Sequence, residues 1–389
     1  MDGPRSAWPG ELPEIIELAE QVFTENGRYP RFMARMLPLF LSPGNAENLL
    51  VIRRDDRIVS MLGTDFRTFV TAGCRIPVAM IGAVCTREDY RGQRLSGLLV
   101  NEAYELCRRR GAALAWISGD RSVYLKMGAE RVWPLFMAKA DRSQLRSLPE
   151  AAGLDVVRAS PDDVPEIVAL HDREPVRFEW TSEWLAVVPA RLMEPDMGVS
   201  YLIRRGGRTV AAGCLRWTGF TGPDHAEPAL ELHDWFGDRR AVVAALPAML
   251  DGARAVRVQC RVTSCDSAMM AALGEAGLSM VPIAPRGWTM KCLDWARLLS
   301  CAAPHLDRAL AGTDAVVAPA ARGFRVSLRG SAAVAAEYAT PDEQTALRIA
   351  FSPRQNWIGT GQASIPPPIE EFLGRVFPLP LRHYGLNYI

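Results

Sequence analysis

The sequence has little of what marks a metal protein, a disulfide-linked protein or a nucleic-acid binder. Only five histidines are spread over 389 residues, and none lies at ligand spacing from a cysteine. The eight cysteines are scattered and form no CxxC pair, which argues against a structural zinc site and predicts reduced thiols used as small core residues. The formal net charge of +1 is not typical of a chain that binds nucleic acid or a membrane surface. We therefore expect no metal and no nucleic-acid partner.

Long apolar runs are also missing. The longest early stretch without charge, Ile76–Thr86, is much too short to cross a membrane. The start, MDGPRSAWPGELPE, lacks the basic and then apolar pattern of a signal peptide. We therefore interpret the chain as cytoplasmic, without a membrane partner. A hydrophobic fraction of 49% and a charged fraction of 23% are typical of globular protein, and the length predicts two or three domains.

What the sequence does contain is an internal repeat. ELPEIIELAE, which begins at Glu11, matches DVPEIVALHD, which begins at Asp163. VIRRDDRIVS, which begins at Val51, matches LIRRGGRTVA, which begins at Leu202. The first pair reads as a helix start after proline, and the second as a hairpin. Because both pairs share an offset of 151 or 152 residues, we predict tandem copies of one domain.

The repeat divides the chain into three predicted domains: 1–145, 146–290 and a small α+β domain over 291–389. In the last, CLDWARLLSCAAPHLDRAL is expected to be helical, VAPAARG a loop and EQTALRIAF a strand. SIPPPIEEFLGRVF is expected to enter a short helix. The expected class is α/β (α+β) with mixed central sheets.

In the first copy, the order is helix, helical stretch, hairpin, strand, helix, strand, helix, strand. A crossover through the helix after Thr86 requires a mixed sheet with helices on both sides. The expected strands cover 49–53, 58–67, 76–86, 112–118 and 131–139.

The segment YRGQRLSGLLVNEAY follows an apolar strand that reaches Thr86. We expect a helix from about Gln93, which buries Leu95, Leu98, Leu99, Ala103 and Leu106 at i, i+3, i+4 spacing. Gly92 allows a tight turn before that helix, and Arg91 and Arg94 add positive charge. A helix start of this kind is suited to a phosphate group, although a solvated basic helix start would look the same.

The segment SGDRSVYLKMGAERV places a short helix after the next strand. Val123, Tyr124 and Met127 lie on it, and Gly128 is expected to end it. Tyr124 then lies at the carboxyl edge of the sheet, where open α/β sheets bind ligands. Ordinary core packing of the phenol is the alternative.

Together the two segments resemble the GNAT acetyltransferase superfamily. The acyl-CoA motif of that family, Arg or Gln, two residues, Gly, one residue, Gly or Ala, corresponds to Arg91-Gly92-Gln93-Arg94-Leu95-Ser96. The family pattern Y-x-K-x-G-F corresponds to Tyr124–Ala129. The resemblance covers about residues 10–140 closely and 155–290 weakly. The whole layout resembles the tandem GNAT group of enhanced-intracellular-survival (Eis) type.

The resemblance implies an acetyl-CoA-dependent N-acetyltransferase that acts on a small amine or a peptide amine. It places acetyl-CoA beside Val84, Cys85 and Thr86. It further implies that the backbone N–H near Val84 binds the thioester oxygen and that the N–H groups of Gln93, Arg94, Leu95 and Ser96 hold the pyrophosphate. Tyr124 would protonate the leaving thiolate. The family also implies that the C-terminal carboxylate, here of Ile389, accepts the amine proton; the alternative is that the apolar tail only docks on its own domain.

Departures from the family pattern limit these expectations. Arg94 replaces glycine and Ala129 replaces an aromatic residue. If residue 94 has φ > 0, arginine costs about 1 kcal/mol, whereas in a helical conformation it costs nothing. In either case we predict that the Arg94 side chain contacts phosphate.

The second copy has Gly237 but no such motif, and Leu273 stands where Tyr124 stands in the first, so we expect no chemistry there. His233 and Asp234 in that copy could line a pocket or serve structure only.

The sequence also allows alternatives for the amine-binding residues, for the function and for the C-terminal domain. Glu25, Asp65 and Asp120 could bind a cationic amine or be solvated surface groups. A non-catalytic acyl-CoA-binding or scaffold protein is the alternative function. A C-terminal domain that binds an apolar ligand is a third. The sequence leaves a homo-oligomer open.

Overall fold

The computed structural model describes residues 1–132, 135–194, 197–218, 228–283, 288–329, 334–359, 364–382 and 385–387. The chain forms two compact units, each built from two segments. Unit 1 combines Met1–Trp133 with Pro285–Pro380, and unit 2 combines Pro134–Ala284 with Leu381–Tyr388. Among the helices described, none has the length and apolarity needed to cross a bilayer.

The sheet of unit 1 runs in the order β1-β2-β3-β4-β5-β14. Pairing is antiparallel except between β4 and β5, as the expected helical crossover requires. The strands are β1 (Asp2–Ser6), β2 (Leu49–Arg54), β3 (Arg57–Thr71), β4 (Cys74–Thr86), β5 (Leu114–Ile117) and β14 (Thr289–Cys292).

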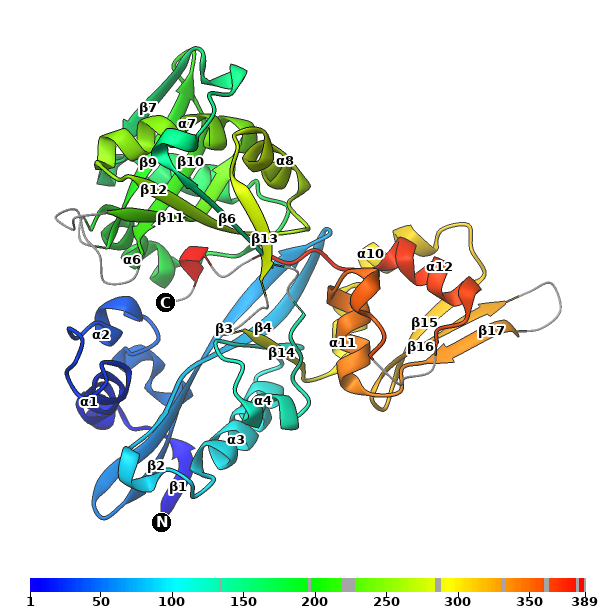
Figure 1. The fold of residues 1–389 in the computed structure, drawn as a ribbon. Coiled ribbons are helices and arrows are strands. Elements are labelled where there is room, and N and C mark those ends of the chain that lie inside the picture. Colours follow the sequence, from blue (N-terminus) through cyan, green and yellow to red (C-terminus); the bar gives the residue numbers. More distant parts are fainter. Residues whose placement is uncertain are drawn as a thin grey trace. The chain divides into compact units, whose positions relative to one another are not determined.

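Helices cover both faces of this sheet: α1 (Leu12–Phe23) and α2 (Met33–Met36) lie on one side of β3 and β4, and α3 (Leu95–Arg109) lies on the other (Figure 1). The short α4 (Ser122–Lys126) follows β5. Leu95, Leu99, Ala103 and Leu106 of α3 are buried as predicted, but Leu98 is 39% exposed. The prediction for Leu98 is wrong because α3 turns only one stripe toward the sheet.

The rest of unit 1 is a small α+β segment with an antiparallel sheet in the order β15-β16-β17. Its elements are α9 (Trp295–Cys301), α10 (Ala303–Leu310), β15 (Ala315–Ala320), β16 (Gly323–Arg329), β17 (Val334–Ala339), α11 (Glu343–Phe351) and α12 (Pro367–Val376).

Two expectations for this segment are wrong. EQTALRIAF is the helix α11, because Asp342 caps its first turn by accepting from Thr345 N at 2.6 Å, and its apolar residues face the core. VAPAARG is not a loop, since it contains the end of β15 and the turn into β16.

The sheet of unit 2 runs in the order β13-β6-β12-β11-β10-β9-β7, and only β11 and β12 pair in parallel. Its strands are β6 (Leu135–Asp141), β7 (Leu154–Arg158), β9 (Gly198–Arg205), β10 (Arg208–Trp217), β11 (Ala229–Gly237), β12 (Arg257–Thr263) and β13 (Ser279–Ile283). The two-residue β8 (Arg177–Phe178) does not belong to this sheet. The helices are α5 (Val164–His171), α6 (Ser182–Met193), α7 (Arg239–Ala253) and α8 (Ser267–Glu275).

The strand expected over 131–139 in the first sheet is instead β6, which pairs with β12 and β13 in the second. In exchange, β14 comes from beyond the second copy and pairs with β5. Each sheet therefore receives a strand that follows the other copy in sequence. Periodicity predicts that a strand exists but not which edge it joins.

The segments that match in sequence also make similar contacts. In unit 1, Arg53 Nη1 donates to Glu14 Oε2 at 2.7 Å, between the first helix and the hairpin. In unit 2, Arg204 Nη2 lies 3.5 Å from Glu166 Oε1 between the corresponding elements. The fold class predicted from the sequence is confirmed.

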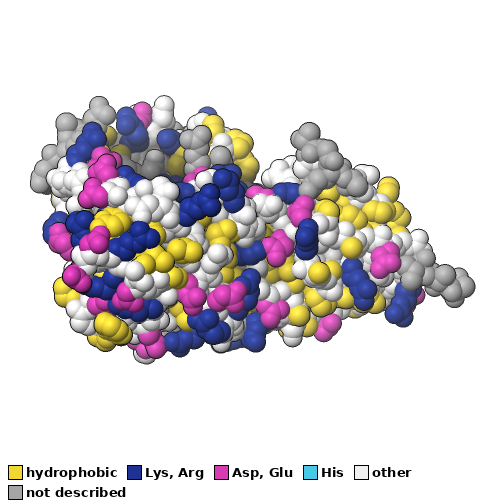
Figure 2. Space-filling model, turned by 90° about the horizontal axis from the view of Figure 1, so that it is seen from below, with side chains coloured by type: hydrophobic (Ala, Val, Ile, Leu, Met, Phe, Trp, Pro, Cys, Tyr) yellow, Lys and Arg dark blue, Asp and Glu magenta, His cyan; other side chains and the backbone are white. Residues whose placement is uncertain are grey.

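All eight cysteines are free, and six of them are buried. This agrees with their expected use as small core residues. On the face drawn in Figure 2, basic and acidic side chains are interspersed, as a net charge of +1 predicts. Any strong positive potential must therefore arise locally.

Candidate active site

The site begins where β4 and β5 separate. Their parallel register joins Val78–Ile81 to Leu114–Ile117, and Ser118 N donates to Ile81 O at 2.8 Å. β4 then continues to Thr86 while the chain after β5 turns away into α4. An opening is thus formed at the carboxyl ends of two parallel strands, which is where open α/β sheets bind ligands.

A β-bulge lies on β4 inside this opening. The register to β3 shifts between Met61 and Gly63, and Ala83 has a φ of 51°. A bulge frees backbone groups from the ladder and re-aims them, so the amide near Val84 is suited to bind an oxygen in the opening. The sequence does not reveal the bulge, because alanine rather than glycine stands at the position with positive φ.

A cavity of about 370 Å³ lies at the end of the opening. Every residue predicted to bind the cofactor lines it: Val84, Cys85, Thr86, Arg91, Gly92, Gln93, Arg94, Leu95 and Ser96. The structure therefore brings these residues together, while their role stays a prediction. Sequence reasoning missed four further lining residues, Val22, Phe23, Tyr90 and Arg121.

Arg121 lies at the N-cap of α4 and belongs to the cavity through folding alone. No spacing pattern in the sequence connects Arg121 to Arg91. Both guanidinium groups lower the pKa of the Cys85 thiol and so partly oppose the effect of its burial. Burial raises the pKa of Cys85 to about 12. The thiol therefore stays protonated near neutral pH and is not a nucleophile.

The loop before α3 has the backbone of an anion cradle. Gly92 has a φ of 78° and Arg94 has a φ of 59°, so residue 94 is left-handed. Helix α3 then begins at Leu95, and Arg94 O accepts from Gly97 N at 3.0 Å. Arginine has no acceptor atom with which to cap the first amides of α3, so they stay suited to a phosphate. Of the two conformations considered for Arg94, the structure has the strained one.

Replacing Arg94 by glycine is expected to act in opposite directions on stability and on binding. Glycine relieves up to about 1 kcal/mol of left-handed strain, so the melting temperature without ligand should rise or stay level. Loss of a cation at the cradle should weaken acetyl-CoA binding about tenfold, as measured by calorimetry. Arg94→Lys, which keeps both charge and strain, is the control. Tighter binding by Arg94→Gly would show that the arginine obstructs the site.

Tyr124 follows β5, the second strand of the opening, and it is not among the described residues that line the cavity. It lies on α4 and is 2% exposed. A Cβ atom at Gly119 would meet Cε2 of Tyr124 at 2.8 Å, so the ring packs directly on that backbone. Thr289 on β14 donates to Gly119 O at 2.8 Å and fixes the same turn. The exchanged strand thus supports the tyrosine that the sequence singled out.

The three acidic residues considered for amine binding are each paired with an arginine. Asp65 accepts from Arg67 at 2.6 Å, Glu25 from Arg28 at 3.0 Å, and Asp120 from Arg131 at 3.3 Å. A cationic substrate would have to compete with these neighbours. The predicted carboxylate of Ile389 lies outside the described residues.

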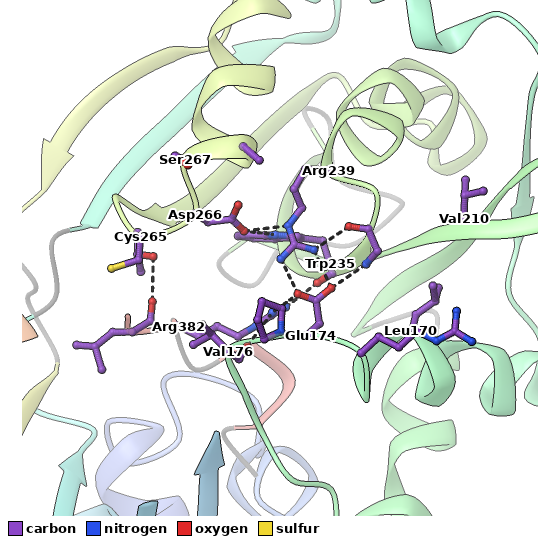
Figure 3. A pocket seen from close by; sticks show the side chains of 16 residues that line it. Leu170, Glu174, Val176, Val210, Trp235, Arg239, Cys265, Asp266, Ser267 and Arg382 are labelled. Atoms are coloured by element: carbon purple, nitrogen blue, oxygen red, sulfur yellow. Dashed lines mark hydrogen bonds and ion pairs between the residues drawn. The ribbon is translucent and has the colours of Figure 1, made fainter. Parts of the chain in front are cut away.

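The corresponding opening of unit 2 is lined by charged side chains that pair with one another. A cavity of about 540 Å³ lies at the ends of β11 and β12, and Figure 3 shows Arg239 between Asp266 and Glu174 within it. Arg239 Nη2 donates to Glu174 Oε2 at 2.6 Å, and Nε donates to Asp266 Oδ2 at 3.0 Å.

The start of α7, which corresponds to the cradle helix α3, is also satisfied internally. The Asp238 carboxylate accepts from Arg240 N at 3.0 Å and from Ala241 N at 3.1 Å. A carboxylate already fills the place of an anion there. Leu273, buried on α8, stands where Tyr124 stands in unit 1.

The described part of the C-terminal tail packs into unit 2. Arg382 Nη2 donates to Asp234 Oδ1 at 2.5 Å and to Trp235 O at 2.6 Å. Leu386 N donates to the other oxygen of Asp234 at 3.0 Å, and Trp180 Nε1 donates to Asn387 Oδ1 at 2.8 Å. Asp234 therefore has the structural role that was one of the two alternatives for it; the other was to line a pocket. His233 is partly exposed on the same strand.

Comparison with known proteins agrees with this geometry. The sequence model of the acetyltransferase (GNAT) domain family matches residues 4–132. No curated protein sequence matches the chain.

Three solved structures have a similar fold. One is a GCN5-related N-acetyltransferase from Anabaena variabilis, at 15% identity, 96% coverage of each chain and a TM-score of 0.65. Another is Eis1 from Mycobacterium abscessus, at 12% identity, 89% coverage of each chain and a TM-score of 0.57. The third is N-myristoyltransferase from Saccharomyces cerevisiae with bound myristoyl-CoA, at 12% identity, 75% coverage of this chain, 80% of that chain and a TM-score of 0.50.

Proposed function

Residues 4–132 are an acetyltransferase domain of the GNAT superfamily, and from this premise we propose that the protein transfers an acetyl group from acetyl-CoA to a primary amine. The amine belongs to a small molecule or a peptide, with cationic aminoglycoside-like amines among the candidates. The observation that carries the proposal is the cavity of unit 1, which is lined by every residue predicted to bind the cofactor. Tyr124 lies on α4, the helix that follows the second strand of the opening. Bound myristoyl-CoA in a fold neighbour supports an acyl-CoA ligand.

In the proposed reaction, amides of the loop and first turn, Gln93 to Ser96, hold the pyrophosphate, and Arg91, Arg94 and Arg121 add positive charge. The bulge amide near Val84 donates to the thioester oxygen, which stabilises the charge that develops when the amine attacks the carbonyl carbon. A C–N bond forms and the C–S bond breaks. Tyr124 gives its proton to the departing sulfur. The amine proton leaves to water or to the Ile389 carboxylate, and the phenolate regains a proton from water.

The two repeats have different roles in this proposal. The copy within 1–145 is catalytic. The copy within 146–290 is non-catalytic, because Asp238 and Arg239 are engaged by partners inside the same copy and Leu273 replaces the tyrosine. The segment 291–389 supports the catalytic copy.

Acetyl-CoA is expected to stabilise the protein against heat, by about 2.7 kcal/mol at a concentration near 100 times Kd. Incubation with a panel of amines should then release free CoA. Arg91→Ala should reduce the stabilisation, whereas Arg375→Ala, at an exposed ion pair with Glu371, should not.

The outcomes separate the proposal from its alternative. Absence of any stabilisation would contradict both readings. Stabilisation without thiol release over the whole panel would instead favour a non-catalytic acyl-CoA-binding protein, the reading to which a strained Arg94 in the cradle also points.

A further inference from the structure

The turn that ends the short helix carrying Tyr124 accepts hydrogen bonds from the C-terminal α+β segment. Helix α4 has only five residues, Ser122–Lys126. A helix of this length has little stability of its own, so tertiary contacts decide whether it forms and where it lies. α3 packs against α4, and α11, more than two hundred residues later in the sequence, adds hydrogen bonds to the turn that ends it.

Gln344, in the first turn of α11, reaches the end of α4. Its Nε2 donates to Leu125 O at 3.2 Å and to Ala129 O at 3.3 Å. These carbonyls bracket the turn that closes α4, in which Ala129 N donates to Tyr124 O at 3.0 Å and Gly128 N donates to Leu125 O at 3.1 Å. One side-chain amide therefore joins both ends of the turn, as a C-cap does from within a chain.

The residues beside Gln344 hold the same turn from two further directions. Glu343 forms an ion pair with the buried Lys291 of β14, and the pair lies against Gly128. A Cβ atom at residue 128 would meet Glu343 Oε2 at 2.6 Å and Lys291 Nζ at 2.7 Å. With a φ of 84°, this position favours glycine. Arg348 Nη1 donates to Glu130 Oε2 at 2.6 Å.

We propose that Gln344 is a positioning residue for acetyl transfer, which acts by fixing the turn that places the Tyr124 hydroxyl. The inference rests on the proposed role of Tyr124 and gives the C-terminal segment a function in catalysis. Gln344 is not among the residues that line the CoA cavity, so its effect belongs to the chemical step and not to acetyl-CoA binding.

The test is a double-mutant cycle between Gln344 and Tyr124. Gln344→Ala removes both donated hydrogen bonds, and Gln344→Glu keeps the size but turns a carboxylate toward two carbonyl oxygens. Each should lower kcat about tenfold, since a displaced catalytic group costs rate, and leave Kd for acetyl-CoA unchanged. In a Tyr124→Phe background the same changes should have less than a twofold effect, because there is no hydroxyl left to misplace.

A readout without substrate accompanies the cycle. Gln344→Ala should accelerate amide hydrogen exchange at Gly128 and Ala129, with exchange in α3 unchanged. Arg354→Ala, at an exposed ion pair with Glu370 on the same C-terminal segment, is the matched control and should change neither readout.

Two results would overturn the inference. One is an equal loss of kcat whether residue 124 is tyrosine or phenylalanine. The other is unchanged amide hydrogen exchange at Gly128 and Ala129. A Tyr124→Phe variant with full activity would instead refute the role of Tyr124 in the proposed function, and the exchange measurement would still show whether Gln344 holds the turn.

Discussion

Replacing Tyr124 by phenylalanine should lower kcat for acetyl transfer by about 10²- to 10⁴-fold, the usual contribution of a positioned general acid. The change removes one oxygen from a ring that is already buried against Gly119, so the packing of α4 should remain. The cradle lies on α3 and its preceding loop, and it does not include Tyr124. Acetyl-CoA should therefore bind as before, and the loss should appear in kcat at saturating amine and not in Kd for acetyl-CoA.

Tyr104 provides a matched control. It lies on α3, 4% exposed, and its hydroxyl is a buried atom without a hydrogen-bond partner among the described residues. Burial raises its pKa, and the nearby Tyr124 adds to the effect. Tyr104→Phe should leave kcat within twofold. If Tyr124→Phe behaved like Tyr104→Phe, the thiolate would leave without this proton and the mechanism would be wrong.

Local patterns in the sequence were sufficient to predict the two sides of this site. The spacing of apolar residues after Gly92 predicted α3, and Gly128 predicted the end of α4, where its φ is 84°. Both depend on contacts within a few residues along the chain, so both can be read from a short window. The motif resemblance then identified the residues that the cavity of unit 1 brings together.

Features that depend on distant partners could not be predicted in this way. The bulge at Ala83 requires the register of β3, and the cavity position of Arg121 requires the fold of α4 against α3. The exchange of β6 and β14 between sheets leaves no trace in periodicity, because a strand keeps its alternation whichever edge it joins. The contact of Gln344 with α4 could not be predicted for a further reason, since the sequence pattern of its segment predicts a strand and the segment is the helix α11.

The fold of unit 2 does not depend on a ligand at the ends of its parallel strands. The core of unit 2 is built from apolar residues on β9 to β12 and α7, which do not depend on a ligand. Polar groups at the strand ends are different, because without a ligand they need partners of their own. In unit 2, Arg239 pairs with Glu174 and Asp266, and the C-terminal tail adds Arg382. The Asp238 carboxylate accepts from the first amides of α7.

Replacing Arg382 by alanine should therefore destabilise unit 2 by about 3–5 kcal/mol, the cost of breaking a buried ion pair by removing one partner. Arg382 is 7% exposed, Glu174 is 4% exposed and Asp234 is fully buried. Glu174 would keep Arg239 after the substitution, but Asp234 would lose a charged donor and keep the amides of Trp235 and Leu386. The measurement is denaturant unfolding, with amide hydrogen exchange in β11 as the readout specific to unit 2.

The expected loss of stability arises because Arg382→Ala leaves the Asp234 carboxylate buried without its charged partner. A variant that removes both charges is therefore the control. Arg382→Met combined with Asp234→Leu removes both members of the pair and should cost less than Arg382→Ala alone, because no carboxylate is then buried without its partner. Arg375→Ala breaks an exposed pair with Glu371 and should cost below about 1 kcal/mol. A cost for Arg382→Ala no larger than that of Arg375→Ala would mean that the tail rests on unit 2 without stabilising it. If the double variant were less stable than Arg382→Ala, the ion pair between Arg382 and Asp234 would contribute net stability to unit 2.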